Sequence, residues 1–149
     1  MVKWKEEMVI DANIEKVWSL FQDRNIKKIM PKVEEHILLE NEDDTKGAIH
    51  SQSYYEGTQM ESYLVETLAY EDKPELKYRA TSFVMGQMFK VNYAFTLEKV
   101  AENQTKFIYE GSNKGVNLTG KAMLLAGSKQ KREATVRTFM ERVNTEATK

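Results

Sequence analysis

Apolar residues recur at helical spacing near both ends of the chain and at every second position between them. The first helical pattern follows a short strand over residues 3–10 and begins after Asn13, whose side chain can cap a helix. A second short helix is predicted to end before Pro31, because a proline disfavours helical dihedral angles at the residue before it. The apolar face of the first helix consists of Ile14, Val17, Trp18 and Phe21.

The middle of the chain alternates between apolar and polar residues, which is typical of β-strands with one buried face. The clearest alternation covers residues 88–100, where large apolar side chains occupy every second position from Phe89 to Leu97. Short polar turns separate the strands, and consecutive strands joined by tight turns pair antiparallel. With the first strand, this meander gives a seven-stranded sheet. The six later strands are predicted over residues 33–40, 48–57, 58–70, 75–84, 88–100 and 105–112.

Residues 116–147 return to helical spacing and contain no proline. Apolar residues form a stripe at the start and at the end of this segment, whereas residues 128–133 are polar on all sides. Such a helix either bends at Gly127 or crosses an opening. A strongly twisted sheet has one concave face to bury, and only this helix is long enough to lie across it. We therefore predict an α+β fold in which a curved antiparallel sheet grips a long C-terminal helix and two short helices close one end.

Composition narrows the function classes. A chain of 149 residues predicts one domain over residues 1–149. Its 22 Lys and Arg are interspersed with 23 Asp and Glu, so we expect no nucleic-acid binding. No apolar run approaches the ~20 residues of a spanning helix, and four charges among the first seven residues differ from a signal peptide. We expect a cytoplasmic protein without membrane insertion, and the absence of cysteine excludes thiolate chemistry.

Several segments carry a family resemblance that spans essentially the whole chain. They are "VIDANIEKVWSLFQD" at residues 9–23, "IMPKV" at 29–33, "YLVETLAYEDKPELKY" at 63–78, "YAFTLEKV" at 93–100 and "QTKFIYEG" at 104–111. Together they resemble the START-like (SRPBCC, helix-grip) superfamily, which includes the birch-pollen-allergen fold, polyketide cyclase and aromatase domains, and activators of the Hsp90 ATPase. The resemblance implies a deep pocket between sheet and long helix, which relatives use to hold sterols, lipids, polyketides or plant hormones.

The segment at residues 48–57 supports a pocket independently. One face of this strand carries His50, Gln52 and Tyr54, and the other face is also partly polar. A strand without a fully apolar face can form the wall of a pocket, or it can be an edge strand with both faces exposed to solvent. Tyrosines on four strands add rings that carry hydroxyl groups, and we expect about half of them to face inward. We expect the cavity to be lined by His50, Gln52, Tyr54, Tyr63, Tyr78, Met88, Tyr93, Phe95 and Met123.

The chain offers little evident catalytic chemistry. His36 and His50 are its only histidines, and nothing in their spacing brings them together with a carboxylate, as a metal site or a triad requires. We expect His36 at a solvated strand start, and His50 as the polar group that could orient a ligand oxygen or act as a general base. The sequence therefore predicts no metal, no cofactor and no catalytic residue.

These observations favour a protein that binds a small hydrophobic or amphipathic molecule, such as a lipid, a polyketide-like or an aromatic compound, rather than an enzyme. One alternative is a cyclase or aromatase-type enzyme, in which tyrosines and His50 direct enolate chemistry. Another is a protein-binding module that resembles the Hsp90 activators. An enzyme needs convergent buried polar groups, a binder needs volume, and a module needs an exposed apolar patch. An exposed edge strand also allows a homodimer.

Overall fold

The computed structural model describes all 149 residues, apart from the side chain of Glu56. One seven-stranded antiparallel sheet has the order β1-β7-β6-β5-β4-β3-β2, which confirms the predicted meander. β1 closes the order by pairing along its whole length with β7. β1 and β2 are the sheet edges, and the homodimer expected at such an edge stays a prediction. The strands are β1 (Val2–Ile10), β2 (Val33–Glu40), β3 (Ile49–Glu56), β4 (Gln59–Asp72), β5 (Leu76–Met85), β6 (Phe89–Ala101) and β7 (Gln104–Gly115).

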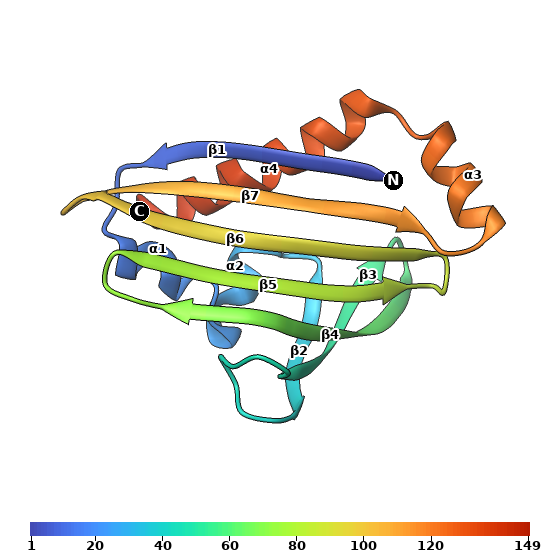
Figure 1. Cartoon of the computed structure of the whole chain (residues 1–149), viewed down its shortest axis with the longest axis horizontal. Coiled ribbons are helices and arrows are strands. Elements are labelled where there is room, and N and C mark those ends of the chain that lie inside the picture. The colour runs from blue at the N-terminus through green and yellow to red at the C-terminus, as the bar shows by residue number, and fades with distance from the viewer.

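The helices pack on the concave side of this sheet. Figure 1 shows α4 running along the sheet, with α1 and α2 near one end of the strands and α3 near the other. The predicted C-terminal helix is divided in two at Gly127, and the Ser128 side chain caps the second part. Of the two predicted alternatives, a bend at Gly127 and a crossing of an opening, the chain follows the first, and the bend is a complete break. The helical elements are α1 (Ile14–Ser19), the 3-10 turn η1 (Asp23–Asn25), α2 (Ile26–Ile29), α3 (Leu118–Ala126) and α4 (Lys129–Ala147).

The core lies where α1 and α4 meet the inner face of β6 and β7. Asn13 caps α1 by accepting a hydrogen bond from the Glu15 N–H, as predicted. Phe21 is fully buried, and its ring centroid lies 4.7 Å from that of Phe95 and 5.7 Å from that of Phe107. Burying one such side chain contributes roughly 1.5–3 kcal/mol. This end of the molecule is therefore a solid core.

Among the described residues, no helix combines the length and the apolar character that crossing a membrane requires.

Candidate functional site

A row of aromatic rings follows the concave face from β3 to α4. Centroid distances are 5.4 Å from Tyr54 to Tyr63, 4.5 Å from Tyr63 to Phe83, and 6.0 Å from Phe83 to Tyr93. The row continues through Phe95 to Tyr109 of β7 and Phe139 of α4. Burial raises the pKa of Tyr63 and Tyr93, so both hydroxyl groups keep their protons at neutral pH.

Most of the predicted lining residues lie along this row. His50, Gln52, Tyr93 and Phe95 border one central space, and Tyr54 and Tyr63 continue the row toward the β3–β4 turn. Met88 lies in the turn before β6, with its carbonyl against α3.

Tyr78 and Met123 lie elsewhere. Tyr78 pairs with Thr96, whereas its neighbour Arg79 pairs with the inward-facing Phe95. Because successive strand residues point to opposite faces, Tyr78 lies on the convex side of the sheet, where it borders a shallow depression. Met123 is 51% exposed on α3 and contributes to none of the described pockets near the other candidates. Neither residue is therefore brought together with the rest of the predicted lining.

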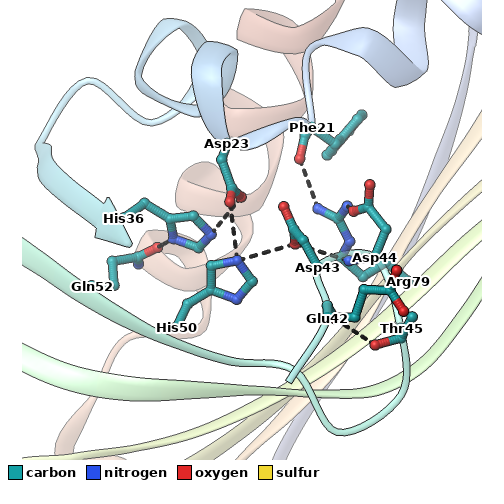
Figure 2. A network of polar contacts seen from close by, with 10 residues as sticks. All are labelled: Phe21, Asp23, His36, Glu42, Asp43, Asp44, Thr45, His50, Gln52 and Arg79. Carbon is teal, nitrogen blue, oxygen red and sulfur yellow. Dashed lines mark hydrogen bonds and ion pairs between the residues drawn. The ribbon is translucent and has the colours of Figure 1, made fainter. Parts of the chain in front are cut away.

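A polar cluster closes the β2–β3 end of the row (Figure 2). The Nε2 atoms of His36 and His50 each lie 3.1 Å from a different carboxylate oxygen of Asp23. The two imidazole rings are stacked, with centroids 4.4 Å apart. The side chain of His36 is 11% exposed and that of His50 is 6% exposed. The expectations that His36 is solvated and that the histidines stay apart from a carboxylate are therefore wrong.

Strand pairing brings the two histidines together. His36 pairs directly with Gln52, and His50 is two residues from Gln52 on the same strand. Residues two apart on a strand share a face, so both imidazoles project toward the helices. Asp23 comes from η1, which follows α1 and holds the carboxylate above the rings. The sequence could have revealed this pair, because in a β2–β3 hairpin two residues that pair across the strands share a face of the sheet. The position of Asp23 depends instead on how the helices dock.

The hydrogen bonds of Gln52 orient His36. The Gln52 amide donates to the Tyr63 hydroxyl, which turns its Oε1 toward His36 Nδ1 at 2.7 Å. Nδ1 of His36 is therefore the donor to Gln52, so a hydrogen bond from Nε2 of the same ring to the Asp23 carboxylate requires a second proton on the ring.

The carboxylates and imidazoles of the cluster shift one another's protonation. Burial alone would raise the pKa of Asp23, but the hydrogen bonds from His36 and His50 hold that pKa well below its usual range. Burial opposes the charging of His50, yet the carboxylates of Asp23 and Asp43 raise its pKa above 6.5. Asp43 contributes through its Oδ1, which lies 3.2 Å from His50 Nε2. The cluster thus favours a positive charge between two carboxylates.

Arg79 joins the β2–β3 loop to the helical end beside the cluster. Its guanidinium donates to the Phe21 carbonyl and to Asp44 Oδ1, both at 2.7 Å. The same group lies 5.4 Å from the Trp18 ring centroid and 5.3 Å from that of Tyr70. These contacts place the loop that carries Asp43 over His50, and Figure 2 shows that arrangement.

The central space between the cluster and the aromatic row is small. It has a volume of about 20 Å³ and is bordered by His36, His50, Arg79, Tyr93 and Phe95, among others. Such a volume holds about one water molecule. Side chains therefore fill most of the pocket that the family resemblance implies, and a larger molecule has to enter from elsewhere or move these side chains.

Two larger openings lie beneath the junction of α3 and α4. One has a volume of about 450 Å³ and the other about 250 Å³, and both are bordered by Val2 and Arg132. Trp4 borders the smaller opening, and its ring packs edge-on against Tyr109 at 5.6 Å, which connects the opening to the aromatic row. The buried Trp4 Nε1 has no hydrogen-bond partner among the described residues. The larger opening combines apolar Leu124 and Leu125 with the cations Lys114, Lys121 and Arg132.

Comparisons with known proteins place the fold. No protein-family model matches the chain, and no curated protein matches its sequence. Solved structures do match. A START superfamily protein from Mycobacterium smegmatis has a TM-score of 0.73 at 12% identity, over 97% of this chain and 96% of that chain. Zhui aromatase/cyclase from Streptomyces sp. R1128 has a TM-score of 0.69 at 10% identity, over 95% and 93%. Ara h 8.0201 has a TM-score of 0.72 at 14% identity, over 98% and 94%.

The chain therefore has the START-like, helix-grip fold. Identities this low establish a shared fold and leave the activity to be argued from the site.

Proposed function

We propose that this protein binds a small amphipathic molecule, with its apolar part beneath the α3–α4 junction and its anionic head at the basic rim. The main support for this proposal is the opening of about 450 Å³, which places three cations beside Leu124 and Leu125. Pockets for small molecules typically combine a mostly apolar lining with a few placed polar groups. The aromatic row behind Trp4 offers further apolar surface once the helices or side chains shift.

Arg132 and Trp4 supply the specificity in this proposal. Arg132 borders both openings, so its guanidinium can pair with a carboxylate from either of them. The unpartnered Trp4 N–H offers a donor to a ligand oxygen, because a buried polar group gains from a partner. A fatty acid of medium length presents both an apolar chain and a carboxylate.

The experiment compares dodecanoate with dodecanol below their micelle-forming concentrations, by displacement of a fluorescent apolar dye. Arg132→Gln is expected to weaken dodecanoate binding about two- to fivefold, as for an exposed ion pair, and to leave dodecanol unchanged. Lys131→Gln is the matched control, since it removes the same charge from a position that borders neither opening. Equal losses in both variants would contradict the role of Arg132.

Native mass spectrometry of freshly purified protein tests the proposal without a chosen ligand. A co-purified small molecule supports it. The absence of such a molecule, together with a flat melting temperature across lipids and aromatic compounds, would reject it.

The polar cluster favours a second candidate function, an enzyme of the cyclase or aromatase class. That class needs convergent buried polar groups beside a substrate space, and His36, His50 and Asp23 converge at the end of an aromatic row. A central space of about 20 Å³ has no room for a polyketide in this conformation. Turnover of a poly-β-ketone that is lost in His50→Gln would favour this candidate over simple binding.

A further inference from the structure

The cluster at the β2–β3 end contains a set of side chains suited to a metal ion. Asp23, His36 and His50 each offer a ligand atom, and these atoms all lie within 4.8 Å of one another. They come from three different elements, η1, β2 and β3, so the folded chain rather than a local motif assembles them. Asp43 adds a carboxylate oxygen 3.2 Å from His50 Nε2.

The orientation of the imidazoles matches that of metal ligands. Both rings direct Nε2 at the same carboxylate, one toward each of its oxygens (Figure 2). The Gln52 carbonyl holds the Nδ1 proton of His36, and that bond leaves Nε2 of the neutral ring as an acceptor. The Nε2 lone pair and the Asp23 carboxylate are both acceptors and repel each other, so their close approach requires a cation between the two atoms. That cation is either a proton or a metal ion.

The types of ligand atom in the cluster and their total charge indicate which class of metal ion would bind. Two neutral imidazoles and two carboxylates carry a charge of −2, which a divalent cation balances. Imidazole nitrogens suit Zn²⁺ and its neighbours among the transition metals, whereas Mg²⁺ and Ca²⁺ prefer oxygen ligands. Zn²⁺ is commonly held by four side chains, or by three side chains and a water molecule.

The small central space adds room for solvent at the same site. It borders both His36 and His50, and its volume of about 20 Å³ is enough for one water molecule. A metal ion held by the cluster can therefore also carry a water ligand.

We propose that Asp23, His36 and His50, with Asp43 as a fourth side chain, form a binding site for one divalent transition metal ion, with Zn²⁺ best matched. The site lies at the opposite end of the concave face from the α3–α4 openings, and the proposal is independent of the ligand proposed there.

The test uses the full chain, purified without a histidine tag and stripped with a chelator. Calorimetry is expected to show one equivalent of Zn²⁺ bound. His36→Gln, His50→Gln and Asp23→Asn are each expected to weaken binding by at least ~100-fold, since even outer partners of metal ligands are worth 10–100-fold. Glu35→Gln is the matched control, because it removes an exposed carboxylate next to His36 that lies outside the cluster and should leave binding unchanged.

A second measurement uses the wild-type chain alone. The protein has two histidines, so its imidazole NMR signals report on these two rings only. Addition of one equivalent of Zn²⁺ is expected to shift the signals of both rings. Unchanged signals for either ring, or zinc binding that persists in both histidine variants, would overturn the site and leave a protonated His–Asp cluster as the explanation of the geometry.

Discussion

Two cationic residues at alternate positions of β5 connect the inner face of the sheet to surrounding segments. Arg79 reaches Asp44 and the Phe21 carbonyl, and Lys77 contacts Glu15 of α1 and Asp72 of β4. The side chain of Lys77 is only 3% exposed. A buried ammonium is tolerated when carboxylates pair with it, so this contact stabilises the position of α1 on the sheet.

Lys77 is expected to make stability depend on pH at the alkaline end. Burial opposes its charge, but hydrogen bonds to Asp72 and Glu15 raise its pKa above 10.5. The stabilisation is therefore complete below pH 10.5 and is lost as the pH rises through the pKa of the folded state. Because both carboxylates are about half exposed, we expect Lys77→Met to lower the free energy of unfolding by only about 1 kcal/mol at pH 8.

The measurement is urea unfolding of both proteins from pH 8 to pH 11.5. The difference between them is expected to shrink above pH 10.5, whereas ionisation of the buried tyrosines destabilises both proteins alike. Lys73→Met is the control, since Lys73 is exposed and its 3.7 Å ion pair is weak. A difference that stays constant to pH 11.5 would contradict the assignment.

The polar cluster shows what sequence reasoning misses at the residue scale. His50 was identified as a buried polar candidate from the mixed faces of its strand, and the structure buries it. The strand start at residues 34–36 predicts a solvated His36, because neighbours in a strand point to opposite faces, but the structure leaves its side chain only 11% exposed. The position of Asp23 depends on the docking of η1, which no local pattern encodes.

At the scale of elements, the contact between β7 and α3 depends on small residues. Gly115 ends β7 directly against the backbone of α3, and Gly120 lies against the Met88 carbonyl in the turn before β6. Asn117 caps the helix by accepting from the Gly120 N–H at 2.7 Å. No side chain fits between these backbones, so the two glycines set how closely α3 approaches the sheet.

Gly120→Ala is therefore expected to destabilise the protein, although alanine favours an isolated helix by about 1 kcal/mol over glycine. The added methyl group would overlap the Met88 carbonyl, and such overpacking typically costs about 1–3 kcal/mol. Denaturant unfolding measures this loss.

Gly127→Ala is the matched control for this prediction. Gly127 has ordinary φ and ψ values of −70° and 150°, and a new methyl group there would meet the movable end of Arg132. We expect little change in stability. If Gly120→Ala instead gains stability relative to Gly127→Ala, helix propensity rather than the close contact governs α3.

Strands and helices were predicted correctly where one hydrophobic periodicity continued over many residues. Alternation from Phe89 to Leu97 predicted β6. The polar segment after Gly127 indicated either a bend there or a helix crossing an opening, and α3 and α4 are separated at that point. The sequence did not show that side chains fill most of the concave face. Cavity volume depends on how facing side chains interdigitate, and alternation identifies a face without fixing its packing.

At the scale of the whole molecule, burial differs between the two ends of the concave face. α1 and α4 contribute many fully buried side chains to the core at one end. α3 contributes Gly120 as its buried residue, while its Leu118 is 85% exposed and its Leu125 is 88% exposed. Regions with few buried contacts open at lower free energy than the core. We infer that α3 is the least stable helix, and it covers the larger opening.

Hydrogen exchange followed by mass spectrometry tests this gradient together with ligand entry. In the free protein, amides of residues 118–126 are expected to exchange well before those of β6 and β7, because opening α3 exposes little apolar surface. Saturating dodecanoate should slow exchange in α3 and at Val2, where the ligand is proposed to lie, and should leave α1 unchanged. Zinc should instead protect η1 and the β2–β3 hairpin. Uniform protection by both additives would show one cooperative unit and would contradict separate sites at the two ends of the face.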